Sequence, residues 1–225
     1  MFRSFILFLI LLSLSISLST AEAKAAVVIS EVYYDHPGDD EGHEFVEIYN
    51  YSNKSVNLSG WQIRWAGNDF SQRTLDLSGS VPARGHFLIG GDYVLADFGI
   101  EPDMIYNFDF QNGGSATDGI RLSDGNGYND TILYDSPNSN LLPGDSGWDN
   151  LSFCPDVSQG HSLGRINLQI DTDIMSDFAD LNDPTPVNSA KTNRNTQAQV
   201  PEGNTLVALS GGLAGINLAG KILKP

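Results

Sequence analysis

A strand–turn–strand block near the start of the chain constrains the possible folds most. In residues 44–50, Val46 and Ile48 fall on one face and the odd-numbered positions on the other, as the two-residue period of a β-strand requires. A polar turn follows at residues 51–55, and the next apolar segment opens with Trp61. The block therefore predicts two neighbouring strands that pack through apolar side chains.

Two glutamates in this block could be taken for a carboxylate pair suited to acid–base chemistry. Glu44 and Glu47 are three positions apart, so on a strand their side chains point to opposite faces. We therefore expect that they do not share one site, and that the apolar residues around them form packing surface.

Nine short segments carry strand-like patterns, and clusters of Gly, Asn, Asp, Pro and Ser separate them. No stretch of ten residues keeps the 3.6-residue period of a helix. Many short strands with such turns predict an all-β sandwich. The predicted strands are Ala26–Tyr34, Glu44–Tyr49, Trp61–Trp65, Arg73–Leu77, His86–Ile89, Met104–Phe108, Gly119–Ser123, Thr131–Tyr134 and Ser162–Leu168.

Several motifs follow one another in a distinctive order. The opening block reads G-x-E-F-V-E-I-Y-N and, after a short polar turn, V-x-L-S-G-W; Val81–Ile89, Ile120–Asp124 and Ser162–Arg165 follow later. Together they resemble the lamin tail domain family over residues 27–190. The resemblance implies an immunoglobulin-like β-sandwich of about eight or nine short strands. It also implies a non-enzymatic surface or extracellular module, with a protein or glycan of the cell envelope or matrix as partner.

Residues 1–26 have the pattern of a secretory signal peptide. Arg3 gives a basic start, Phe5–Leu18 is apolar, and residues 21–26 offer A-x-A cleavage options. The alternative is an anchoring transmembrane helix, for which the apolar stretch is short compared with a span of about 20 residues. We expect a signal peptidase to process the chain during export to the periplasm, cell surface or outside of a bacterial cell.

Residues 205–225 form a mostly small and apolar tail. The tail follows the sequence Val200-Pro201-Glu202 and ends with Lys221 and Lys224. This arrangement resembles a PEP-CTERM sorting segment, which implies recognition and removal by an exosortase. The alternative is a Gly/Ala tail or a short helix lying on a membrane. Residues 191–204 indicate a flexible linker, so membrane contact is expected only transiently, through the terminal segments.

The predicted mature chain is strongly acidic. Residues 27–200 carry 26 acidic and 8 basic side chains, a net charge of −18. Such a charge repels nucleic acids and anionic membranes, so the DNA and chromatin roles linked to eukaryotic lamin tails are not expected here. Cys154 is the single cysteine, which excludes an intrachain disulfide. The fold must therefore rest on packing, with bound cations as an additional source of stability.

The loop at residues 35–44 combines four carboxylates ahead of Glu44 with two histidines. Hard carboxylate oxygens suit Ca²⁺, whereas His36 and His43 suit a transition metal. The alternative is a solvated acidic connection between strands. No cofactor is required by the sequence, and Ca²⁺ is the candidate. The candidate calcium ligands in this loop are Asp35, Asp39, Asp40 and Glu41.

A second candidate calcium loop has oxygen ligands at positions 1, 3 and 7, namely Asp124, Asn126 and Asp130. It lacks the D-x-D-x-D-G order and the glutamate at position 12 of a calcium loop. The alternative is a hairpin turn in which Gly and Asn supply positive φ. The aspartate-rich residues 171–183 offer similar ligands, with an exposed acidic loop as the alternative.

Residues 160–164 match G-x-S-x-G, the motif around a hydrolase nucleophile, with Ser162 at its centre. A triad of that type needs a histidine after the serine and a helix behind it. No histidine follows Ser162, and residues 165–170 alternate like a strand. His161, adjacent in sequence, would point to the opposite face. We therefore predict a late strand of the sandwich and no enzyme activity.

Four aromatic residues have two possible roles, in ligand binding or in the core. They could form a platform that stacks on carbohydrate, although aromatic residues in a sandwich more often belong to the core. These residues are Trp61, Trp65, Phe70 and Trp148.

Overall fold

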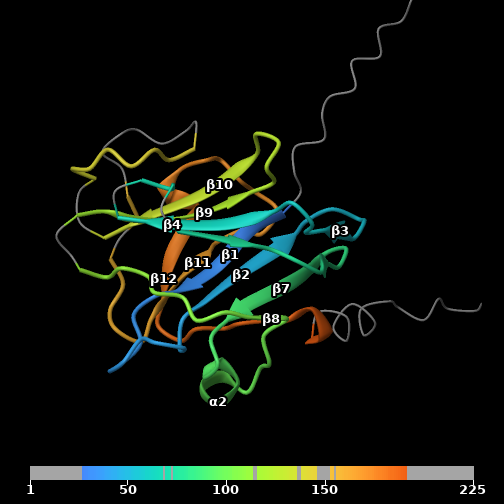
Figure 1. The fold of residues 1–225 in the computed structure, drawn as a ribbon, viewed down its shortest axis with the longest axis horizontal. Helices are drawn as coiled ribbons and strands as arrows, with labels where there is room; N and C mark the ends of the chain where they lie inside the picture. Colours follow the sequence, from blue (N-terminus) through green and yellow to red (C-terminus); the bar gives the residue numbers. More distant parts are fainter. Residues whose placement is uncertain are drawn as a thin grey trace, which may run out of the picture.

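Two β-sheets pack face to face in the computed structural model (Figure 1). The structure describes residues 27–191 apart from residues 68, 72, 114–115, 136–137, 146–152 and 155. The predicted signal peptide, the sorting tail and all but the first residue of the predicted linker lie outside the described residues. Across the described part of the chain, no helix is both long enough and apolar enough to cross a membrane.

The larger sheet is mostly antiparallel, and only its last pair, β7 with β8, is parallel. The strand β1 lies in its middle and pairs with β11 on one side and β2 on the other. In spatial order the six strands are β12 (Phe178–Leu181), β11 (Ser162–Arg165), β1 (Val27–Tyr33), β2 (Phe45–Asn50), β7 (Gly85–Gly90) and β8 (Met104–Ile105).

The smaller sheet lies against the larger one and is wholly antiparallel. Its four strands, in spatial order, are β10 (Asn129–Tyr134), β9 (Asp118–Ser123), β4 (Gln62–Ala66) and β5 (Arg73–Asp76). A separate two-stranded ribbon pairs β3 (Val56–Asn57) with β6 (Ser80–Val81). The described residues therefore form the all-β, immunoglobulin-like sandwich that the sequence predicts.

The core between the sheets is built from the alternating apolar positions of the strands. Val46 and Ile48 of β2 are fully buried there and belong to the same cluster as Ile63 of β4 and Ile120 of β9. The aromatic residues are part of this core as well. Trp61, Trp65 and Phe70 are each less than 10 % exposed, which confirms that these three belong to the core and do not form a platform for carbohydrate. Trp148 lies outside the described residues.

The outer face of the larger sheet is covered too. Phe45 and Leu88 pack there with Tyr33 and with Val94 of the short helix α2 (Val94–Phe98), in a second buried cluster. Burial on both faces explains why every residue of β1 and β2 is buried.

Residues 184–189 cross this outer face as irregular backbone that becomes helical at Ser189, and we call this segment the C-terminal strap. Three backbone N–H groups of the strap donate hydrogen bonds to carboxylates of the sheet and its edge: Thr185 to Glu31 (2.8 Å), Val187 to Glu47, and Ser189 to Asp103 (2.9 Å). These donors are every second residue of the strap. The strap therefore adds donors to carboxylates that the sheet already bonds in part, since Glu31 also accepts the hydroxyl of Ser162 and Glu47 that of Ser30.

All nine predicted strands are present, with some ends shifted. The strand predicted at Ser162–Leu168 stops at Arg165, because Asn167 forms a turn in which its side chain accepts the N–H of Gln169 and its carbonyl that of Ile170. The strand predicted at Met104–Phe108 stops at Ile105. The sequence patterns did not reveal β3, β6, β12 or α2, which are only two to five residues long.

Candidate binding site

The acidic loop at residues 35–44 is held in place by its own carboxylates and by α2. Asp40 accepts the N–H of His36 at Oδ1 (2.8 Å) and the side-chain amide of Asn112 at Oδ2 (3.1 Å). At the end of the loop, the N–H of Tyr93 donates to Gly42 (2.9 Å). The loop is therefore a folded turn fixed to neighbouring elements at several points.

The four predicted calcium ligands of this loop do not all lie together. Asp35 accepts a hydrogen bond from Gln159 (3.3 Å), and burial is the main cause that raises its pKa. Asp39 accepts the N–H of Glu41 (3.3 Å) within the loop. Asp40 and Glu41, in contrast, line a common pocket. The structure thus separates the four residues into two groups, and calcium binding by the loop remains a prediction.

The pocket has a volume of about 330 Å³ and lies between the acidic loop and the segment that follows β8. Its lining combines four carboxylates and one amide with two phenylalanines. Its lining residues are Asp40, Glu41, Glu44, Asn107, Phe108, Asp109 and Phe110. A small ligand or one side chain of a partner has a suitable size for such a space.

Glu44 is the unusual member of the lining. Its side chain is 0 % exposed; Oε2 accepts the backbone N–H of Phe110 (3.1 Å), and no described residue gives Oε1 a hydrogen bond. Burial raises the pKa of Glu44 to about 9, with smaller contributions from the negative charges of Asp40 and Asp109. An unsatisfied buried oxygen lowers the stability of a protein by about 1–3 kcal/mol. A ligand that gives this oxygen a hydrogen bond would recover part of that free energy.

The aromatic side of the pocket is rigidly packed. The rings of Phe108 and Phe110 are stacked with centroids 4.5 Å apart, and Trp65 meets both edge-on. The indole of Trp65 donates to Asp109 (2.8 Å), whose other oxygen is paired with Arg73 (3.2 Å). The core of the sandwich thus positions both the aromatic side of the pocket and the carboxylate of Asp109.

The two histidines of the loop lie together beside α2. The rings of His36 and His43 are stacked at 3.8 Å with an interplanar angle of 13°, and Tyr93 stacks on His43 at 4.6 Å. Asp97 of α2, which the sequence did not indicate, contacts His43 at 2.7 Å. Donor atoms of His36, His43 and Asp97 lie within 4.8 Å of one another. Parallel rings direct their lone pairs side by side, so binding a transition metal would require the rings to turn.

The second predicted calcium loop has a different arrangement. Asp124 accepts the backbone N–H groups of Asn126 (2.8 Å) and Tyr128 (3.0 Å), as in a turn stabilised by an aspartate. Asp130 is buried and bonds to Ile29 N and to the guanidinium of Arg165. The carboxylates of Asp124 and Asp130 therefore bond to separate partners, and calcium binding at this turn stays a prediction.

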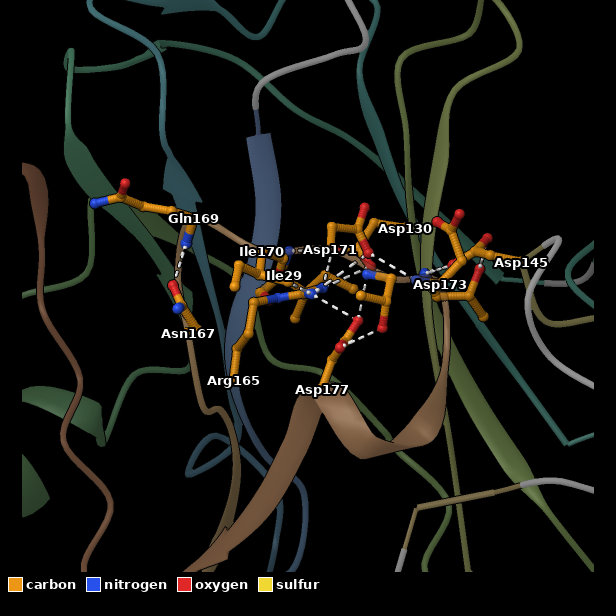
Figure 2. Close-up of polar contacts among 12 residues, drawn as sticks. Ile29, Asp130, Asp145, Arg165, Asn167, Gln169, Ile170, Asp171, Asp173 and Asp177 are labelled. Carbon is orange, nitrogen blue, oxygen red and sulfur yellow. Dashed lines mark hydrogen bonds and ion pairs between the residues drawn. The ribbon is translucent and has the colours of Figure 1, made fainter.

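Arg165 is the centre of a buried ionic network (Figure 2). Its side chain is 0 % exposed, and it contacts Asp130 (2.8 Å), Asp171 (3.5 Å) and Asp177 (3.5 Å). Burial raises the pKa of Asp130 and Arg165 lowers it; two bonds to one guanidinium keep the carboxyl ionised. The aspartate-rich segment, for which the sequence left calcium binding and an exposed loop as alternatives, thus supplies two carboxylate partners of the Arg165 guanidinium.

Ser162 of the G-x-S-x-G motif is buried in β11 and donates its hydroxyl to Glu31 of β1 (2.7 Å). The neighbouring His161 is paired with Asp180 at 2.9 Å instead. The described contacts therefore give Ser162 a carboxylate acceptor in place of an imidazole base. The role of this serine in the structure is to link two strands of the larger sheet.

Comparison with known proteins gives one family. A family model described as Lamin Tail Domain matches residues 20–143, which is more than half of the chain. No curated protein gives a significant match. The matched residues include β1 to β10 and the whole lining of the pocket, whereas β11, β12 and the C-terminal strap follow the match.

Proposed function

Since the chain belongs to the lamin tail domain family, an immunoglobulin-like β family, we propose that it is an exported, non-catalytic binding module. The observation that carries the proposal is the pocket beside β2. Its lining residues offer carboxylates, an amide and aromatic side chains, which can hold a ligand by charge, hydrogen bonds and apolar contact. We place the module at the surface or in the extracellular matrix of a bacterial cell, with a protein or glycan as partner.

Two features support export. The first 26 residues have the three-part pattern of a signal peptide, and residues 205–225 resemble a sorting tail. Mass spectrometry of the protein recovered from a bacterial host tests both. The expected product begins within residues 22–27 and lacks the tail; a product with both ends intact in the cell lysate would contradict the proposal.

The charge of the chain supports the choice of partner. A formal net charge of −16 for the whole chain opposes binding to DNA, RNA and anionic lipid. A glycan array and a pull-down from envelope extract, each performed with the mature protein, test the partner class. Saturable binding to a glycan or an envelope protein is expected, and binding to nucleic acid alone would overturn the assignment.

A calcium-dependent adhesion domain is the second candidate. It is favoured by the position of Asp40 and Glu41 on one pocket together with Glu44. Melting curves in EDTA and in millimolar CaCl₂ decide between the two, because an ion that binds only the folded state raises the melting temperature. A rise of several degrees supports the calcium candidate, and superimposable curves leave the calcium-independent module.

A further inference from the structure

Glu44 is the residue of the acidic pocket whose hydrogen bonding is incomplete. Oε1 is buried and lacks a donor among the described residues, while Oε2 is held by the N–H of Phe110. The side chain is therefore fixed through one oxygen, while the other is buried at the wall of the pocket without a hydrogen-bond partner. When Glu44 is ionised, Oε1 lacks a hydrogen-bond donor, and a ligand that enters the pocket is the group able to supply one.

The charges around Glu44 select a cation. Asp40, Glu41 and Asp109 line the same pocket. In the described part of the chain, the basic group that acts on Glu44 is Arg73, and its guanidinium is paired with Asp109 (3.2 Å) and also donates to the backbone carbonyl of Asp109 (3.4 Å). The pocket thus has more negative than positive charge, and a cationic group is attracted to it.

The spacing of the carboxylate oxygens and the aromatic lining of the pocket favour an organic cation over a bare metal ion. Among the described residues, the one group of three or more metal-ligating side chains within 4.8 Å is that of His36, His43 and Asp97, so the carboxylates of the pocket are spread more widely than one ion requires. The volume of about 330 Å³ exceeds that of an ion. Phe108 and Phe110 line the pocket although they are only 2 % and 7 % exposed, and they give the apolar stem of such a cation an apolar wall.

We propose that this pocket binds an organic cation with N–H donors, an ammonium or guanidinium group on an apolar stem, and that Glu44 Oε1 accepts one of its hydrogen bonds. The proposal rests on the function proposed above and gives the chemistry of the ligand. The lysine or arginine side chain of a partner protein and a free amine share this chemistry.

Binding is coupled to a proton. The ionisable groups that face Glu44 are Asp40 of the loop, Asp109 after β8, Arg73 of β5 and Tyr134 of β10. Burial and the two aspartates raise the pKa of Glu44 to about 9, so the free protein carries a proton there at pH 7. A cation that enters the pocket favours the carboxylate, and the proton is released to the buffer.

The test is titration calorimetry of the full chain with cadaverine and agmatine, repeated in two buffers of different ionisation enthalpy. Both probes are expected to bind with release of up to one proton at pH 7. Tetramethylammonium, which has a charge but no hydrogen-bond donor, is expected to bind roughly tenfold more weakly. The backbone amide resonance of Phe110, which bonds to Glu44, is expected to shift on binding.

Glu44→Gln is the decisive variant, because the amide keeps the shape and removes the charge. It is expected to lower the affinity roughly tenfold or more and to abolish proton release. Glu101→Gln removes the same charge from an exposed position elsewhere and is expected to bind like wild type. Equal binding by wild type and Glu44→Gln, a Phe110 resonance that does not move, or CaCl₂ binding that displaces both amines would overturn the proposal.

Two further arms identify the source and separate this inference from the proposed function. A peptide with a single lysine that binds more tightly than cadaverine indicates a partner protein, and the reverse order indicates a free amine. If an envelope partner binds Glu44→Gln with the same affinity as wild type, the protein is still a binding module, but the pocket is not the site at which that partner binds.

Discussion

Ser162 donates its hydroxyl hydrogen bond to Glu31 across two paired strands, at an Oγ–Oε1 distance of 2.7 Å and with both residues buried. Glu31 also receives two bonds from Thr185 of the C-terminal strap, at 2.8 and 3.0 Å. Burial, followed by the charge of Glu47, raises the pKa of Glu31, whereas Ser162 and Thr185 lower it. Ser162 is therefore one of the donors that make a buried carboxyl group tolerable.

Replacing Ser162 with alanine tests this role against that of a nucleophile. Ser162→Ala is expected to lower the free energy of unfolding by about 1–3 kcal/mol, because a buried carboxyl group loses a donor. Hydrolysis of p-nitrophenyl acetate by the variant is expected to equal that of wild type. Loss of a measurable wild-type esterase activity in a folded Ser162→Ala protein would refute the structural role.

The proton on Glu44 gives a pH dependence whose sign is unusual for a carboxyl group. The unfolded side chain titrates near 4.5 and the folded one near a pKa of about 9, so between these pH values the unfolded state binds fewer protons. Stability therefore falls as pH rises through this range. Glu44→Gln is expected to be equal to wild type near pH 4 and more stable by up to about 5 kcal/mol at pH 8, measured by urea denaturation. A variant less stable than wild type at pH 8 would contradict the assignment.

Removing Arg165 is expected to destabilise the protein, because its carboxylate partners would stay buried without a positive charge beside them. Arg165→Met leaves Asp130 without the guanidinium that binds both its oxygens. A loss of about 3–5 kcal/mol at pH 7 is expected, measured by urea denaturation. The deficit should be smaller at pH 4, where Asp130 takes up a proton. Arg84→Ala, at an exposed position, serves as the control and should stay within about 0.5 kcal/mol of wild type.

Gly91 fixes the acidic loop to the sheet, because an added Cβ there would overlap the backbone of Gly42. Its N–H also donates to the carbonyl of Glu44 (3.1 Å). Gly91→Ala is expected to destabilise the protein by more than about 2 kcal/mol and to weaken binding at the pocket. Gly113→Ala, where an added Cβ meets nothing within 4 Å, should melt like wild type.

The strands could be predicted because the two-residue period is a local signal. The alternation of Val46 and Ile48 places them in the core, and Glu44 and Glu47 are on opposite sides as their spacing predicts: Glu44 reaches Phe110, and Glu47 reaches Val187. The short elements were missed because two to five residues are too few to establish a period.

The pocket and the ionic network could not be predicted for a different reason. Glu44 is buried by Phe110, which is 66 positions away, and Arg165 meets Asp130 at a separation of 35. No local pattern indicates which distant segment will supply the donor. The loop carboxylates were recognisable as a group, but their division between Asp35 and the pocket depends on Gln159 and on the segment after β8.

The C-terminal strap has a consequence for where this domain ends. Glu31, Glu47 and Asp103 all lie inside the stretch matched by the family model, yet each is bonded to the backbone of residues 185–189, more than forty positions beyond its end. A fragment cut at residue 143 would also lose β11 and β12 from the larger sheet. The cooperative folding unit is therefore longer than the stretch that identifies the family, and in the described part of the chain it extends at least to Ser189.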